Sequence, residues 1–96
     1  MINRILLVAA AAYGVTQDDI IGRGRTRHVS RARHVAMWLA RQLTVMSYEA
    51  IGAVLGGRDH TTVLYAVRKI EALHEDNQES AGILDALRFR CGVRVP

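Results

Sequence analysis

The feature that most constrains the fold is a glycine pair that separates two stretches of helical apolar spacing. Ile51, Val54 and Leu55 precede Gly56 and Gly57. A longer apolar stripe follows them: Val63, Ala66, Val67, Ile70 and Leu73. Residues three and four apart share one face of an α-helix, and glycine readily adopts the left-handed conformation that ends one. A short helix, a glycine turn and a longer helix predict a helix-turn-helix over about residues 47–75.

The rest of the 96-residue chain also has helical patterns. We therefore predict an all-α fold, a helix-turn-helix bundle of about six helices in one domain with its core at about residues 2–87. The first helix is expected from about Ile2 to Tyr13, ended by Gly14, and a short second helix is expected after a Thr16 cap. Residues 22–29, GRGRTRHV, are expected to form a basic loop, and residues 92–96 a C-terminal tail.

Ser30 is the expected cap of the third helix and Ser47 that of the fourth. The third helix has one apolar stripe: Ala32, Val35, Ala36, Leu39 and Leu43. We expect Arg33, Met37 and Arg41 on the opposite side. The fifth helix should begin at Asp59 or His60. A last helix is indicated by four apolar residues: Ile83, Leu84, Leu87 and Cys91.

The charge is unevenly distributed along the chain. The net charge is +4, and twelve of the thirteen basic residues are arginine. Residues 20–48 contain six arginines and no acid, whereas residues 70–87 contain five acids and no Lys or Arg. This split predicts a positive end of the fold that is suited to a polyanion. Arginine is also the side chain suited to bidentate phosphate and guanine contacts.

The N-terminal residues MINRILLVAAAAYG allow two interpretations. A basic residue, an apolar run and Ala-x-Ala options are typical of a signal peptide. Apolar residues at helical spacing favour a helix of the domain instead, and the run is far shorter than the ~18 residues of a membrane span. We therefore expect a cytoplasmic protein with no membrane contact. The single cysteine, Cys91, excludes an internal disulfide and is expected to be an inert thiol.

The polar run Arg58-Asp59-His60-Thr61-Thr62 at the start of the fifth helix suggests several kinds of site. We expect no enzyme, because adjacent residues on a helix do not face each other and the His-x-Thr pattern of some phosphoesterases lacks its second copy. The chain has no Gly-x-x-x-x-Gly-Lys-Ser/Thr loop, so no nucleotide or other cofactor is expected. The four histidines lack paired ligand spacing, so no metal is expected.

A helix cap explains only part of this run. Asp59 is a good N-cap, expected to accept the amide of Thr62. The neighbouring polar side chains would project from the N-terminus of the second helix of a helix-turn-helix, where a recognition helix offers its base-reading side chains.

Residues 51–73, IGAVLGGRDHTTVLYAVRKIEAL, resemble the signature of the C-terminal DNA-binding domain (domain IV) of the bacterial chromosomal replication initiator DnaA. Residues 25–44, RTRHVSRARHVAMWLARQLT, are similar to that family's basic loop and following helix, and the resemblance continues from Ile2 to about Leu87. It implies a Trp-repressor type of helix-turn-helix that binds double-stranded DNA at short sites called DnaA boxes, linked to replication initiation or its regulation.

The resemblance also implies roles for single residues. Four match the major-groove readers: Asp59, His60, Thr61 and Thr62. Arg25 matches the arginine that enters the adjacent minor groove. Arg33, His34 and Arg41 fall at positions that contact phosphates. For Arg58, a phosphate contact and support of the turn both remain open.

Some features depart from the family pattern. Ala32 replaces a usual proline, His34 a usual glutamine and Tyr65 a common histidine. The ATPase domain of the initiator is absent from these 96 residues, so we expect either an excised domain or a stand-alone protein. The alternative function is a protein-interaction module or a transcriptional regulator derived from this domain. Such a module would use helix one, whose second apolar face (Leu7, Val8, Ala11) could bind a partner or a second copy, or the outward Leu64 and Tyr65.

Overall fold

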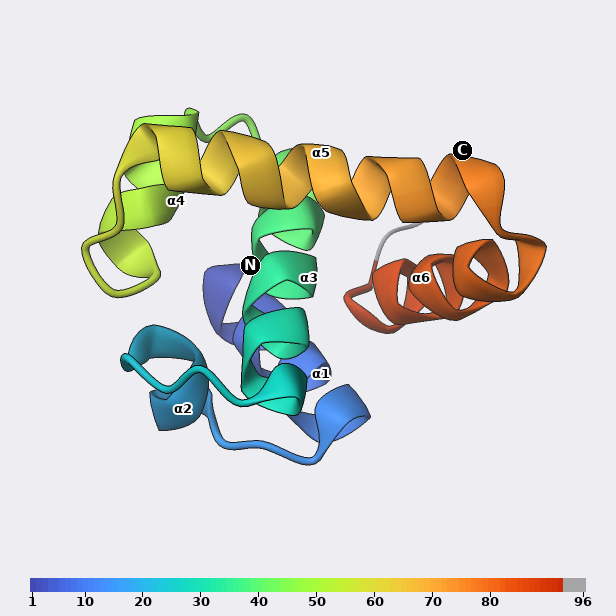
Figure 1. Ribbon diagram of the computed structural model, residues 1–96, viewed down its shortest axis with the longest axis horizontal. Coiled ribbons are helices and arrows are strands. Elements are labelled where there is room, and N and C mark those ends of the chain that lie inside the picture. Colours follow the sequence, from blue (N-terminus) through green and yellow to red (C-terminus); the bar gives the residue numbers. More distant parts are fainter. Residues whose placement is uncertain (93–96) are drawn as a thin grey trace.

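The computed structural model of the protein describes residues 1–92, which form six helices and no strand. The helices are α1 (Ile2–Tyr13), α2 (Gln17–Ile21), α3 (Arg27–Leu43), α4 (Tyr48–Val54), α5 (His60–Asp76) and α6 (Gln78–Arg90). This arrangement confirms the predicted all-α helix-turn-helix bundle (Figure 1). Apart from Gly92, the predicted C-terminal tail lies outside the described residues.

Most of the predicted helix ends are correct. Gly14 ends α1 with a φ of 67°, and Thr16 caps α2 in a reciprocal capping box with Asp19. Ser47 caps α4 by accepting the amide of Ala50. The cap predicted for α3 is wrong, because Thr26 and not Ser30 accepts the first free amide. The helix therefore begins one turn earlier, at Arg27, and the basic loop shortens to residues 22–26.

The helix α3 is the centre of the fold. It contacts every other helix, and α5 crosses over it in Figure 1. Because neighbours cover it on several sides, Met37, Trp38 and Leu39 are all buried. The burial of Met37 shows that the side of α3 opposite the apolar stripe is covered as well. A single apolar stripe is typical of a helix that packs on one face, whereas other helices cover α3 on several sides over most of its C-terminal half.

The turn between α4 and α5 depends on glycine at three positions. Gly56 and Gly57 have φ angles of 90° and 70°, in the left-handed region that the glycine pair predicts. Gly52 lies inside α4 and accepts a 2.8 Å hydrogen bond at its carbonyl oxygen from the amide of Arg58. A Cβ at residue 52 would overlap the carbonyl oxygen of Arg58. The missing side chain thus allows the turn to fold back against α4.

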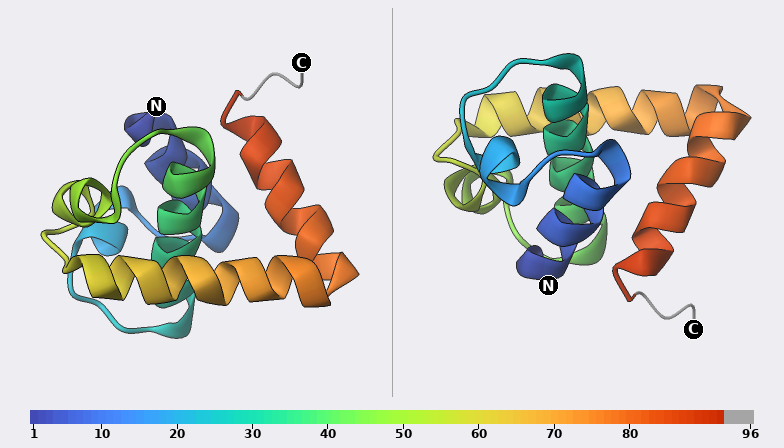
Figure 2. Two further views of the ribbon diagram at one scale, coloured as in Figure 1. Left: turned by 90° about the horizontal axis from the view of Figure 1, so that it is seen from above. Right: turned by 90° about the horizontal axis from the view of Figure 1, so that it is seen from below.

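The last helix turns back from the end of α5, as both views in Figure 2 show. Of the four apolar residues that indicated this helix, Leu84, Leu87 and Cys91 are buried, whereas Ile83 is 51% exposed and does not belong to the core. A polar contact holds the two helices together on another side, since His74 Nε2 lies 2.8 Å from Asp85 Oδ1.

The second apolar face of α1 is only partly available to a partner. Leu7 and Ala11 are exposed, whereas Val8 is buried in the core. Among the described residues, no helix has both the length and the apolar character needed to cross a membrane.

Two helical glycines make a matched test of this packing. Gly52→Ala should lower the free energy of unfolding by about 3 kcal/mol, because the new methyl group overlaps backbone that cannot move aside cheaply. Gly82→Ala in α6 should raise it by about 0.5–1 kcal/mol, since nothing lies within 4 Å of the added Cβ and alanine is the better helix former. Urea unfolding followed by circular dichroism measures both. Equal effects of the two substitutions would contradict the packing role of Gly52.

Candidate nucleic-acid interface

The N-terminus of α5 presents the four predicted base readers. Asp59 is the N-cap, and its Oδ2 accepts from the amide of Thr61 at 3.2 Å rather than from Thr62 as expected. Its other oxygen lies 3.3 Å from Nδ1 of His60, so the expectation that these neighbours cannot face each other is also wrong. That expectation assumed two helical residues, whereas a cap residue has extended backbone and can reach its successor.

The side chains of this N-terminus are open to solvent. Those of His60 and Asp59 are 56% and 66% exposed. Thr62 is exposed and Thr61 half-buried. The pair of Asp59 and His60 therefore lies on an open surface, not in a closed cavity that could desolvate a reacting group. Across residues 1–92, no group of three metal-ligating side chains comes together.

Arg33 occupies an environment that sequence reasoning did not anticipate. Its side chain is buried, with 7% of the residue exposed. Nε donates to the carbonyl oxygen of Ile20 at 2.7 Å, and Nη1 to that of Gly24 at 3.0 Å. Nη2 donates to the carbonyl oxygens of Asp19 at 2.9 Å and Gly22 at 3.0 Å. All three guanidinium nitrogens are thus bonded to the backbone of α2 and the start of the basic loop.

Arg58 reaches the same end of α2 from the turn between α4 and α5. Its Nη1 donates to the carbonyl oxygens of Ile21 and Leu55, and its Nη2 to that of Gly22. Two roles were left open for Arg58, a phosphate contact and support of the turn, and these bonds favour support of the turn. They join the helix-turn-helix to a segment more than thirty residues earlier in the chain.

The position of the two guanidinium groups has a simple electrostatic cause. The last carbonyls of a helix have no partners within it and form the negative end of its dipole. The last turn of α2 contains no basic side chain of its own, and Arg33 and Arg58 provide the missing donors. Burial lowers the pKa of Arg33, and the positive charge of Arg58 lowers it further. The guanidinium nevertheless remains charged, as arginine does in proteins.

The other two predicted phosphate contacts differ from each other. Arg41 is exposed, donates to the carbonyl oxygen of Met46 at 3.0 Å and lies over the ring of Tyr48 at 4.6 Å. His34 is half-buried. Burial lowers its pKa, and the nearby charges of Lys69, Arg31, Arg33 and Arg58 lower it further. His34 is therefore a neutral donor at pH 7 and not a cation.

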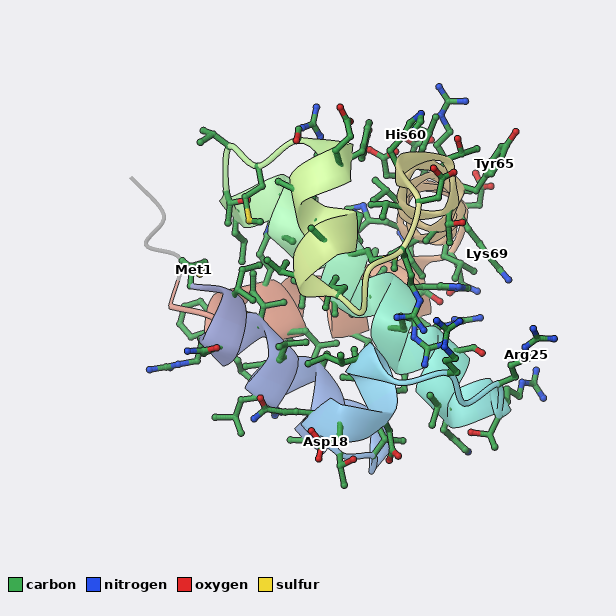
Figure 3. The ribbon with its side chains drawn as sticks, turned by 90° about the vertical axis from the view of Figure 1, so that its left-hand side faces the viewer. Met1, Asp18, Arg25, His60, Tyr65 and Lys69 are labelled. Atoms are coloured by element: carbon green, nitrogen blue, oxygen red, sulfur yellow. The ribbon has the colours of Figure 1, made fainter. Side chains whose placement is uncertain are left out.

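Several exposed polar side chains lie on one side of the molecule. Figure 3 shows His60, Tyr65, Lys69 and Arg25 on the same side, from α5 and the basic loop. Tyr65 is 66% exposed, and Lys69 is exposed. Sequence reasoning did not propose Lys69 as a site residue. The signal was its spacing, since Thr61, Tyr65 and Lys69 follow at intervals of four and share a helix face.

This fold and this surface define the class of protein. A glycine turn joins α4 to α5, and the exposed end of α5 lies beside a basic loop, which is the arrangement of a helix-turn-helix protein. The family model described as "Bacterial dnaA protein helix-turn-helix" matches residues 2–70. The chain belongs to this family.

Its relatives are much longer proteins. It is 48% identical over 86 residues to the chromosomal replication initiator protein DnaA of Caulobacter vibrioides. The matched segment covers 90% of this chain and 18% of the relative. The protein of that name from Thermus thermophilus is 42% identical over 87 residues, 91% of this chain and 20% of its own length. The protein of that name from Bartonella quintana is 48% identical over 94 residues, which are 98% of this chain and 19% of the relative. The chain thus spans about a fifth of the length of these relatives.

The role of Arg33 predicts a loss of stability on substitution. Arg33→Ala should lower the free energy of unfolding by about 3 kcal/mol, because it leaves buried carbonyl oxygens without donors. Arg33→Lys should restore only part of this, since an ammonium group lacks the planar fork that spans the carbonyls. Arg27→Ala, an exposed position on the same helix, is the control and should change stability by less than about 0.5 kcal/mol. Similar urea midpoints for Arg33→Ala and Arg27→Ala would contradict this role.

The lowered pKa of His34 predicts a pH dependence of stability. The unfolded chain has the ordinary histidine pKa of 6.5, whereas the folded pKa lies below it. Between the two values the unfolded state binds more protons, so the stabilisation is present above pH 6.5 and is lost as the pH falls through the folded pKa. Urea unfolding at about pH 7.5 and about pH 5.5 should therefore show a smaller difference for His34→Gln than for the parent. If the stability difference between the two pH values were the same for His34→Gln and the parent, His34 would not be the source of the pH dependence.

Proposed function

We propose that this chain binds double-stranded DNA sequence-specifically at DnaA-box-like sites, in replication initiation or its regulation. The single observation that carries this proposal is the exposed N-terminus of α5 with its four short polar side chains. It lies on the same side of the molecule as Arg25 of the basic loop (Figure 3). A helix end and a flexible cation on one side suit the major groove and the adjacent minor groove of a duplex.

The side chains at this end offer complementary chemistry to base edges. A carboxylate such as that of Asp59 can accept from cytosine N4, and His60 can reach a purine acceptor. The methyl group of a threonine packs against the thymine methyl. The contact between Asp59 and His60 supports this proposal further, because it orients the imidazole before DNA arrives.

The arginines divide into two groups in this proposal. Arg25 and Arg41 are exposed, and we assign Arg25 to the minor groove and Arg41, together with Lys69, to phosphates. Neutral His34 would donate a hydrogen bond to a phosphate without adding charge. Arg33 and Arg58 hold the backbone that positions the loop and the turn, so they act on DNA binding through geometry.

The proposed biological process rests on the relatives. They are chromosomal replication initiator proteins, and this chain matches about a fifth of their length. The matched part contains the helix-turn-helix. We therefore propose that the chain contributes recognition of DNA to such a process.

Selection of binding sites in vitro with the purified 96-residue chain tests this function directly. The chain should enrich one short asymmetric motif from random duplexes, because a single recognition helix and one loop read adjacent grooves. Enrichment of no motif would overturn the sequence-specific proposal. A pull-down of a protein partner that resists nuclease, together with no gel shift, would favour the interaction module instead.

Two substitutions separate base reading from phosphate contact. His60→Ala should cost about 1–3 kcal/mol on the selected motif and much less on scrambled duplexes, because it removes a base contact. Lys69→Gln should weaken both kinds of duplex equally and reduce the salt slope of log K by about one. Each cationic phosphate contact should contribute about −0.9 to the parent slope. Fluorescence anisotropy at several salt concentrations measures all of these. If His60→Ala lost the same binding free energy on the selected and the scrambled duplexes, His60 would not be a base reader.

A further inference from the structure

A cavity of about 320 Å³ lies where α1, α3, α5 and α6 meet. Apolar side chains form much of its wall: Ala12, Val35, Ile70, Leu73, Ile83 and Leu84. Its volume is at the lower end of the range for small-molecule sites, which are concave and mostly apolar with a few polar groups. Ile70 follows His60 by ten residues, so the cavity is about 15 Å along α5 from the proposed readers.

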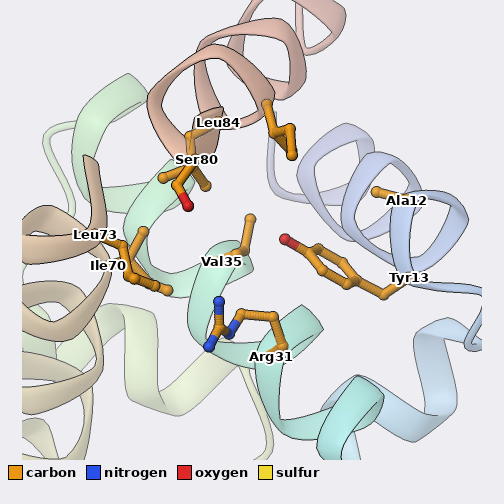
Figure 4. A pocket seen from close by; sticks show the side chains of 9 residues that line it. Ala12, Tyr13, Arg31, Val35, Ile70, Leu73, Ser80 and Leu84 are labelled. Carbon is orange, nitrogen blue, oxygen red and sulfur yellow. The ribbon is translucent and has the colours of Figure 1, made fainter. Parts of the chain in front are cut away.

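Three polar side chains enter this cavity from three different helices. Figure 4 shows the hydroxyl group of Tyr13, the guanidinium group of Arg31 and the hydroxyl group of Ser80 around Val35. Within residues 1–92, none of these three side chains forms a hydrogen bond or ion pair with another residue. Their donors therefore remain available to a molecule in the cavity.

The charges around the cavity favour an anion. No acidic side chain lines it. Asp76 lines an adjoining hollow, but Arg31 and Lys69 border that hollow too, so cations outnumber the acid there. Burial raises the pKa of Tyr13 while the charge of Arg31 opposes the rise. The phenol thus keeps its proton at neutral pH and can donate it in a hydrogen bond.

We propose that this cavity binds a small carboxylic acid with an apolar body. The carboxylate pairs with Arg31 and accepts from the hydroxyl groups of Tyr13 and Ser80, and the apolar body packs on Val35 and Leu84. An arginine fork with two further donors matches a planar carboxylate, and the apolar wall accounts for the rest of the molecule. This site lies apart from the proposed base readers at the start of α5, and the proposal does not depend on DNA binding.

An NMR titration of the chain without DNA tests the proposal, with octanoate as the probe. Octanoate should bind saturably with a dissociation constant on the order of 1 mM, as suits a ligand of about ten heavy atoms. The shifted amides should belong to residues around Tyr13, Val35 and Leu84, and not to those around His60. Octylamine, of the same length and opposite charge, should bind at least about tenfold more weakly. Equal binding of the two, or no saturable octanoate binding, would overturn the proposal.

A pair of variants tests the role of the cation. Arg31→Gln should weaken octanoate binding by about tenfold, because it removes a charged donor to the carboxylate. Arg90→Gln changes the net charge equally at an exposed position outside the cavity, and it should leave binding within about twofold. Thermal unfolding confirms that both variants are folded, as expected for Arg31, which makes no polar contact within the described chain. Equal binding by Arg31→Gln and Arg90→Gln would show that the cavity does not recognise the carboxylate.

Discussion

The rest of the structure depends on how the carbonyl end of α2 is satisfied. This helix has five residues, too few to be stable alone, and its last carbonyls need donors from outside the helix. Arg33 from α3 and Arg58 from the turn donate to those carbonyls and to the first residues of the basic loop. One set of backbone oxygens therefore connects the central helix, the turn and the loop. The two elements proposed to enter adjacent grooves are fixed to a common point.

The direction of α5 follows from backbone geometry at the turn as much as from these bonds. Gly52 permits the chain to pass close to α4, and the two left-handed glycines reverse its direction. Asp59 then starts the helix by accepting the amide of Thr61. Behind the readers, Val63 and Val67 are buried against the core. Each of these features is local, and together they aim the polar end of α5 outward.

Local signals explain why much of this could be predicted from the sequence. The glycine turn, the Ser47 and Thr16 caps and the apolar stripe of α5 depend on neighbouring residues, so a pattern indicates them. The environments of Arg33 and Met37 depend on which helices surround α3, and a periodic pattern does not contain that information. The contacts of Arg58 with Ile21 and Gly22 join residues 36 and 37 positions apart. The cavity beside Arg31 likewise needs four helices to be in place. Its lining residues give no joint signal along the chain.

The buried arginines also determine what the exposed ones can do. The guanidinium of Arg33 is bonded at all three nitrogens to carbonyl oxygens and has little left to offer a phosphate. In the proposed complex Arg33 therefore adds positive potential without a direct contact. Burial lowers the pKa of His34, and the charges of Lys69, Arg31, Arg33 and Arg58 lower it further, so His34 adds no further cation to the proposed interface. Exposed residues such as Arg25 and Lys69 pay no such desolvation cost. In the proposed complex, the potential that attracts DNA therefore arises from both groups, whereas the direct contacts come from the exposed group alone.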